Sequence, residues 1–256
     1  MKEENKFYLY DFLYDNCSTR LWDMLNNHTS STYTLKEILP SNNISFRNLL
    51  HEYLNEGGQY WSKLGIDILL GLPVDKKITG KEAMFLPDYL MASIDSTTIN
   101  GQPLTNSKKI LLPQQFQPTK NSFTGPQVIF TLLWLIIVLL STNRKTSQSK
   151  FLKVFDFLFF LITGLTGILL IFMWAGTNHA VCANNFNLLW AMPINVIIAF
   201  LVRNYVKHKK TFMYITIWYL LVLLVWFFLP QQLNPALIPV AATAFIRSFS
   251  RSYFVN

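Results

Sequence analysis

The residue best suited to covalent chemistry in this chain is a cysteine near its start. Cys17 lies in the run Asp-Asn-Cys-Ser-Thr-Arg, which begins at Asp15. Asp15 and Asn16 are typical N-cap residues, so we expect a helix over residues 17–26 with the thiol in its first turn. The helix dipole and the free N–H groups of that turn stabilise negative charge, and the thiolate is the nucleophilic form of cysteine.

Two other interpretations of Cys17 stay open on the residues alone. It could be a small buried hydrophobic residue, or it could form a disulfide with Cys182, the other cysteine. A disulfide requires that both cysteines face an oxidising compartment. We predict a reactive thiol, because the start of a helix favours that form.

A thiol nucleophile normally works with a histidine that takes its proton, as in papain-like enzymes. Of the four histidines, His179 is our candidate base, because it follows a long apolar run in an uncharged loop. A loop histidine can also be merely exposed, so a non-catalytic role stays open. Six further residues are candidates for the site. We expect two of them to support the helix start (Asp15, Asn16) and four to contact substrate (Arg20, Asn185, Asn187, Trp190).

Metal and nucleotide chemistry have no signature in this sequence. It contains no Cys-x-x-Cys, no His-Glu-x-x-His and no glycine-rich phosphate loop. We therefore expect neither a metal nor a cofactor.

The positive charge is concentrated in the second half of the chain. Residues 1–125 contain 12 Lys and Arg against 13 Asp and Glu, whereas residues 126–256 contain 10 against a single acid, Asp156. The ten basic residues form three short patches between or after long apolar runs. This pattern is a membrane-topology signal and not a nucleic-acid footprint, so we expect no nucleic-acid partner.

The apolar runs are long enough to span a bilayer as helices, which takes about 20 residues. The first is short and the fifth is interrupted by Arg247. The expected spans cover residues 128–140, 154–174, 186–202, 212–229 and 233–249.

The basic patches predict the orientation of these spans. They lie at residues 144–153, 203–210 and 247–251, whereas the loops at 175–185 and 230–235 contain no Lys or Arg. The positive-inside rule places the patches and the C-terminus in the cytoplasm. We therefore expect an inner-membrane protein whose N-terminal domain faces the periplasm. Because residues 1–6 contain no apolar signal core, we also expect that the natural beginning is missing.

The predicted organisation is an outward α+β domain over residues 1–112, a linker over 113–126 and an all-α membrane domain of about five helices over 127–256. In the outward domain we expect an amphipathic helix that begins after Ser45. A Thr79–Glu82 capping box should open another helix, which Pro87 kinks. Asn100-Gly101 predicts a hairpin turn.

Four ordered segments resemble the outward domain of the Lnb-type lipoprotein N-acyltransferases. They are residues 10–20 (Tyr-Asp-Phe-Leu-Tyr-Asp-Asn-Cys-Ser-Thr-Arg), 46–54 (Phe-Arg-x-Leu-Leu-His-Glu-Tyr-Leu), 65–75 (Gly-Ile-Asp-Ile-Leu-Leu-Gly-Leu-Pro-x-Asp) and 85–90 (Phe-Leu-Pro-Asp-Tyr-Leu). Residues 185–193 (Asn-x-Asn-Leu-Leu-Trp-x-x-Pro) resemble the five-helix membrane domain of the same family.

The resemblance implies a thiol acyltransferase in a fold similar to circularly permuted NlpC/P60 (papain-like) enzymes, with Cys17 as the matched nucleophile. Members of the family usually carry a Gly-His segment before the Asp-Asn-Cys motif, and this chain has none. We therefore expect weak activity of this polypeptide unless His179 acts as the base.

The function implied is transfer of an acyl chain from a phospholipid to the N-terminal amine of a diacylated lipoprotein through a Cys17 thioester. The partners are then the phospholipid donor, the lipoprotein N-terminus and the bilayer. Two alternatives stay open, a membrane-anchored cell-wall amidase or peptidase and a catalytically dead remnant that acts as a membrane interaction protein. A peptidase would need one anchoring helix and not five.

Overall fold

The computed structural model describes residues 8–28, 33–112 and 124–254, and these form two compact units. The first unit contains Met1–Tyr53 and Lys76–Pro118, and the second contains Leu54–Asp75 and Thr119–Asn256. This division differs from the boundary that we predicted, because residues 54–75 pack with the membrane helices. Most of the predicted linker, residues 113–123, lies outside the described residues.

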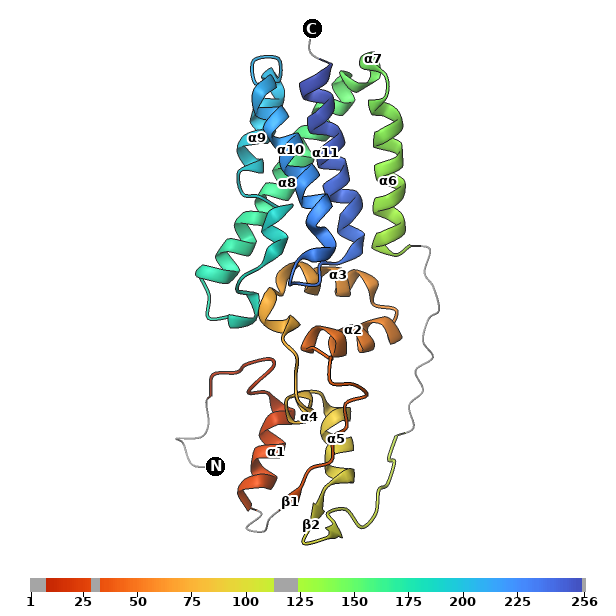
Figure 1. Cartoon of the computed structure of the whole chain (residues 1–256), viewed down its shortest axis with the longest axis vertical. Helices are drawn as coiled ribbons and strands as arrows, with labels where there is room; N and C mark the ends of the chain where they lie inside the picture. The colour runs from red at the N-terminus through yellow and green to blue at the C-terminus, as the bar shows by residue number, and fades with distance from the viewer. Residues whose placement is uncertain (1–7, 29–32, 113–123, 255–256) are drawn as a thin grey trace. The chain divides into compact units, whose positions relative to one another are not determined.

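Short helices and a small sheet build the first unit (Figure 1). Its elements are α1 (Cys17–His28), β1 (Tyr33–Thr34), most of α2 (Phe46–Glu56), α4 (Gly80–Ala83), α5 (Pro87–Ser96), β2 (Thr98–Ile99) and β3 (Gln102–Pro103). The strands pair antiparallel in the order β1-β2-β3. The structure is thus mostly helical with a weak sheet, and a papain-like arrangement stays a prediction.

The hairpin between β2 and β3 confirms the expected turn. Asn100 and Gly101 adopt positive φ angles of 51° and 79°, as a two-residue turn of this hand requires. The register pairs Ile99 with Gln102 and Thr98 with Pro103. The turn therefore sets the pairing of the sheet edge.

The segment after Thr79 forms two helices, where we expected one kinked helix. Thr79 and Glu82 make the predicted capping box at the start of α4. Pro87, however, occupies the first position of a new helix, α5, and does not bend an existing one. A proline at this position sacrifices no helical hydrogen bond, which is why the chain restarts there.

Aromatic rings form the centre of the first unit. Phe46 and Phe85 are buried and meet edge to face, with 5.3 Å between the ring centroids. Phe12 and Tyr14 extend this contact from the loop before α1, with centroids 6.1 Å from Phe85 and 5.5 Å from Phe46 respectively. The loop that leads to Cys17 therefore packs directly on this core.

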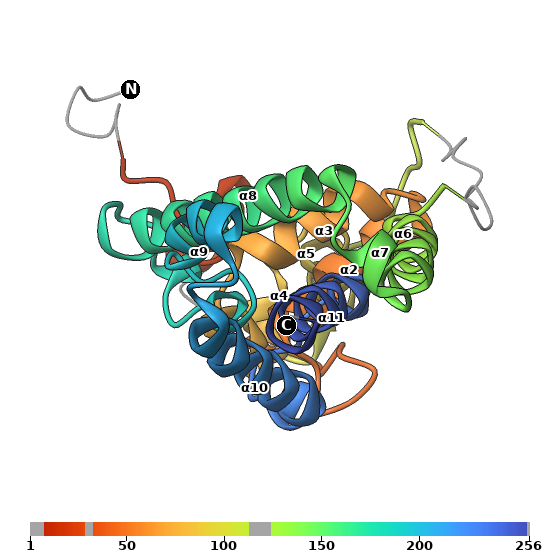
Figure 2. The same ribbon diagram turned by 90° about the horizontal axis from the view of Figure 1, so that it is seen from above.

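The second unit is a helical bundle with a short helix, α3 (Tyr60–Leu69), at one end (Figure 1). Its other elements are η2 (Leu72–Asp75), α6 (Pro126–Ser141), α7 (Arg144–Ser147), α8 (Lys150–Ala175), η3 (Ala180–Cys182), η4 (Phe186–Leu189), α9 (Asn195–Leu201), η5 (Val202–Asn204), α10 (Lys209–Val225), η6 (Trp226–Phe228), η7 (Pro235–Leu237) and α11 (Ile238–Tyr253). Figure 2 shows the bundle end-on, where α10 lies beside α11 and α8 beside α9.

Two of the five expected spans are single helices long and apolar enough to cross a membrane, α8 and the continuous stretch Lys209–Phe228. Helix α6 is apolar but shorter. The third expected span is not one helix. It divides into η4, an irregular segment around Pro193, and α9 with η5. Pro193 explains the break because it has no N–H group to donate to a helical hydrogen bond. Asn185 and Asn187 contribute because their side chains bind backbone groups that a helix would use.

Two glycines let α8 approach the irregular segment and the start of α9 closely. A Cβ on Gly167 would lie 2.0 Å from the carbonyl oxygen of Ala191, and one on Gly164 would lie 2.4 Å from the backbone nitrogen of Val196. Only glycine fits at such distances. The broken span is therefore held against α8 by backbone contact.

The basic patches meet at one end of the bundle, as the topology prediction requires (Figure 1). A cavity there is lined by Arg144, Lys209 and Lys210 together with Phe254 near the C-terminus. Residues from all three patched segments thus lie on the same side of the bundle.

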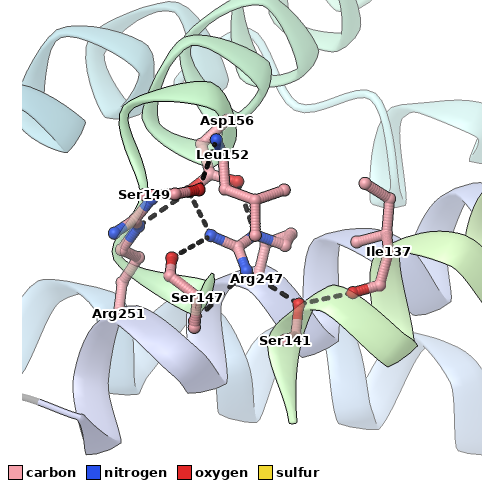
Figure 3. A network of polar contacts seen from close by, with 8 residues as sticks. All are labelled: Ile137, Ser141, Ser147, Ser149, Leu152, Asp156, Arg247 and Arg251. Atoms are coloured by element: carbon pink, nitrogen blue, oxygen red, sulfur yellow. Dashed lines mark hydrogen bonds and ion pairs between the residues drawn. The ribbon is translucent and has the colours of Figure 1, made fainter. Parts of the chain in front are cut away.

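Arg247, which the sequence predicts to interrupt the fifth span, forms a buried ion pair with Asp156 (Figure 3). Its Nε and Nη2 donate to Asp156 at 2.6 and 2.9 Å, and its Nη1 donates to Ser141 Oγ at 2.7 Å. Arg251 donates to the same carboxylate at 2.7 Å. The sequence analysis placed these two arginines in a cytoplasmic basic patch. In the structure their side chains are buried inside the bundle. The network joins α6, α8 and α11.

Candidate functional site

A tight loop leads into the helix that carries Cys17. The backbone N–H and C=O groups of Asp11 and Asp15 bond reciprocally, at 3.1 Å in both directions. The Asp11 carboxylate closes the turn by accepting from the N–H groups of Leu13 and Tyr14, each at 2.9 Å. Leu13 is buried beneath the loop. Hydrogen bonds within the loop therefore hold its conformation before α1 begins.

Asn16 caps α1, as the sequence predicted. Its side-chain oxygen accepts from the N–H groups of Ser18 at 2.8 Å and Thr19 at 3.0 Å. Its amide nitrogen donates to the carbonyls of Phe12 and Phe85, both at 2.9 Å. The buried Asn16 side chain thus links the helix start to the loop before it and to the segment that precedes α5.

Cys17 itself is exposed at the first position of α1, and both cysteines are free. Cys182 is buried, and burial raises the pKa of its thiol. The two thiols belong to different units. Cys17 is therefore the accessible thiol of the part of the chain that the structure describes.

Arg20 and Asp15 form a two-pronged ion pair beside the thiol. The Arg20 Nε–H donates to one Asp15 oxygen and Nη2 donates to the other, the second at 2.7 Å. The guanidinium also lies over the ring of Tyr8, 4.3 Å from its centroid. Asp15 thereby raises the pKa of Arg20. The pair keeps a cation close to the exposed start of α1.

His179 is exposed in the loop after α8, in the second unit. Its Nδ1 lies 3.1 Å from the hydroxyl of Thr177, which donates its own proton to the carbonyl of Met173 at 2.6 Å. That hydroxyl then accepts from the ring, so in a neutral imidazole the hydrogen lies on Nδ1 and Nε2 carries the lone pair. This tautomer suits a general base, and the catalytic role of His179 stays a prediction.

The predicted substrate residues after His179 make hydrogen bonds inside the second unit. Asn185 donates to the carbonyls of Ile68 and Leu69 at 2.8 and 3.0 Å. Asn187 donates to the carbonyl of Asp67 at 2.9 Å and accepts from the Trp190 indole at 2.8 Å. These side chains fasten the end of α3 to the broken span. A direct role in substrate binding stays a prediction.

Sequence reasoning missed Gln231, which completes this attachment. Its amide nitrogen donates to the carbonyl of Leu70 at 2.9 Å, and its oxygen accepts from the N–H of Phe186 at 2.7 Å. The signal available in the sequence was a glutamine pair between two apolar runs, which reads equally well as an ordinary loop.

The fold and this site define a helical membrane protein that carries a small domain with an exposed cysteine at a helix start. Residues 118–256 match the family model described as the Lnb transmembrane domain, and residues 1–52 match the Lnb N-terminal periplasmic domain. The chain belongs to the Lnb family, and the resemblance is confirmed. Searches of curated proteins and of solved structures gave no match.

Membership of this family places the chain among lipoprotein-modifying membrane proteins. It is an inner-membrane protein with a periplasmic N-terminal domain. Its membrane setting brings it into contact with lipids and lipoproteins.

Proposed function

We propose that this protein transfers an acyl chain from a phospholipid to the N-terminal amine of a diacylated lipoprotein, with Cys17 as the nucleophile. One observation carries the proposal. The accessible thiol lies at the first position of a fixed helix, in a membrane protein of a lipoprotein-modifying family. Both lipid substrates are confined to the membrane, so a membrane domain brings them to the same surface.

The reaction proceeds in two displacements. The Cys17 thiolate attacks the ester carbonyl of the phospholipid, the C–S bond forms, and the C–O bond breaks. The lysophospholipid leaves as an alcohol after it takes a proton. The lipoprotein amine then attacks the thioester, the amide forms, and the thiolate leaves while the amine loses a proton. This is a ping-pong scheme.

The helix start determines which backbone groups can stabilise the oxyanion. Asn16 already occupies the N–H groups of Ser18 and Thr19. Among the described residues no acceptor is bonded to the N–H of Cys17, which is the first donor of the helix. A donor at this position lies close to any carbonyl that the thiol attacks. Arg20, held by Asp15, adds a positive charge beside the same surface.

His179 is the base that we propose for the first proton transfer. In the neutral ring, the contact with Thr177 places the hydrogen on Nδ1 and leaves Nε2 to accept the proton. In the proposed reaction it removes the thiol proton and later returns one to the leaving alcohol.

The test uses a host depleted of its own lipoprotein N-acyltransferase, with the gene expressed from its natural locus. Mass spectrometry of lipoprotein N-termini should show a third acyl chain with the wild type. Cys17→Ala should abolish it, and Cys17→Ser should leave little, because an alkoxide forms far less readily than a thiolate near neutral pH.

Cys182→Ala is the matched control, because it removes the buried thiol and leaves Cys17 in place. It should retain the third chain. Triacylated lipoprotein from the Cys17→Ala variant would contradict the mechanism, and a wild type without N-acylation would contradict the function.

A further inference from the structure

A cavity of about 560 Å³, which we call the Lys63 cavity, lies at the end of the bundle opposite to the basic patches (Figure 1). It is lined by the start of α3, the start of α6 and η7, including Tyr60, Lys63, Gln127 and Asn234. The volume is in the range of small-molecule binding sites. This cavity belongs entirely to the second unit.

The cation of this cavity is Lys63, whose side chain is half-buried. Its ammonium donates to the neutral Asn55 side chain at 3.0 Å, and among the described residues it forms no salt bridge. Burial lowers the pKa of Lys63, whereas the charge of Asp67 acts in the opposite direction. A bound anion would compensate the desolvated ammonium.

The start of α6 adds donors to the same cavity. Gly125 caps this helix without a side-chain hydrogen bond. The first N–H groups of a helix have no partner within the helix, so those of Gln127 and Val128 are oriented to bind an anion. Lys63, Gln127 and Val128 all line the same cavity.

An apolar cavity of about 410 Å³ follows directly along the same elements. Lys63 and Ala236 line the Lys63 cavity, while their neighbours Leu64 and Leu237 line the apolar one. On α6 the lining passes from Val128 to residues 130–137, deeper in the bundle. The two cavities therefore succeed each other along α3, α6 and the α11 start.

Three threonines in the apolar cavity do not make it polar. Thr163, Thr166 and Thr243 donate to carbonyls of their own helices, at 2.9, 3.0 and 2.8 Å. The indole N–H of Trp190, another lining residue, is satisfied by Asn187. The cavity offers methyl groups and rings, which suit a hydrocarbon chain.

We propose that these two cavities form the binding site of one phospholipid, with its phosphate at Lys63 and the start of α6 and an acyl chain between α6, α8 and α11. An amphiphile matches a cavity that carries one lysine at a helix start and that is followed by a cavity lined almost wholly by apolar groups. Its use as the acyl donor rests on the proposed function, whereas the binding itself does not.

Photo-crosslinking of the full chain in nanodiscs tests the site. The probe is a phosphatidylethanolamine with a diazirine in one acyl chain, and the comparison probe is a diacylglycerol with the same chains. Peptide mapping should place the phospholipid label on α6, α8 and α11 at the apolar cavity. Lys63→Gln should lower labelling by the phospholipid about tenfold, as loss of a charge-assisted contact predicts, and should not change labelling by the diacylglycerol.

A cavity-filling variant tests the acyl-chain site independently. Thr166→Phe should exclude both probes, whereas Leu165→Phe, on the neighbouring exposed position of α8, should retain labelling. Lys81→Gln, an exposed lysine of the first unit, is the control for loss of charge. Labelling that is unchanged in both Lys63→Gln and Thr166→Phe would overturn the proposal.

The experiments distinguish a failure of the phospholipid site from a failure of the proposed acyltransferase function. Cys17→Ala should retain the crosslinks, because Cys17 is not part of the cavities. Crosslinks without N-acylation would leave the lipid site standing and refute the proposed function. N-acylation with labelling spread over the lipid-facing helices would refute this site.

Discussion

At the scale of single residues, the two cysteines have opposite environments. Cys17 is exposed at a helix start, and Cys182 is buried with a raised pKa. A thiol reacts through its thiolate and only where a reagent can reach it. These environments, more than the residue type, are why we propose Cys17 and not Cys182 as the nucleophile.

This difference predicts selective alkylation. Maleimide should label Cys17 of the folded protein rapidly and Cys182 slowly, because burial shields the Cys182 thiol and raises its pKa. Mass spectrometry of the labelled peptides measures both rates. Denatured protein, in which both thiols should react, is the control. A Cys17–Cys182 disulfide in non-reduced peptides would end the nucleophile hypothesis.

At the scale of elements, the second unit depends on close helix contacts that tolerate no added volume. Gly167→Ala would place a methyl group 2.0 Å from the Ala191 carbonyl. Backbone atoms cannot move aside as a side chain can, so we expect a loss of about 2 kcal/mol or more in the free energy of unfolding.

Thermal unfolding in detergent measures the effect, and Gly65→Ala is the matched control. A Cβ on Gly65 in α3 meets nothing within 4 Å, so that variant should be neutral or more stable by about 0.4–1 kcal/mol. Equal melting temperatures of the two variants would contradict the packing described here.

The buried ion pairs and the hydrogen bonds of Arg247 join four elements, α6, α7, α8 and α11, at the basic end of the bundle. Arg247 contacts Asp156 on α8, Ser141 on α6 and the carbonyl of Ser147 on α7 at 3.1 Å. Arg251 also lies over the Tyr205 ring, 4.8 Å from its centroid. The carboxylate of Asp156 compensates two cations that have almost no access to solvent.

Removal of that carboxylate should therefore be costly. Asp156→Asn leaves two buried guanidinium groups without a counter-charge, and we expect a loss of about 3–5 kcal/mol in the free energy of unfolding. The melting temperature in detergent measures it. Asp23→Asn, an exposed change on α1, should have little effect. An Asp156→Asn protein as stable as wild type would show that the network is not a stabilising joint.

At the scale of the whole molecule, the common end of the basic patches predicts the orientation in the membrane. The test uses a variant in which both native cysteines are replaced. In that background, Gln102→Cys should react with an impermeant maleimide in intact spheroplasts, and Thr146→Cys should react only after lysis. Both positions are exposed. Ser147 would be a poor reporter, since it is buried beside Arg247. The reverse labelling pattern would invert the topology.

The local signals of the sequence predicted local structure well. Asn16 as a cap, the Thr79–Glu82 box and the Asn100-Gly101 turn were all readable, because each involves residues at most a few positions apart. The long apolar runs and the basic patches indicated a membrane domain for a similar reason, since length and charge act through the bilayer and not through a particular partner.

Long-range contacts were decided by the tertiary structure alone. From the sequence, Arg247 interrupts the fifth span. In the structure Asp156, 91 positions away, compensates its charge. Residues 54–75 were assigned to the outward domain because nothing local shows that Asn185, Asn187 and Gln231 bind the backbone of α3. The two adjoining cavities likewise arise from segments far apart in the chain. Hydrogen bonds and burial between distant segments depend on how the chain folds back on itself, and the linear sequence does not encode that as a readable pattern.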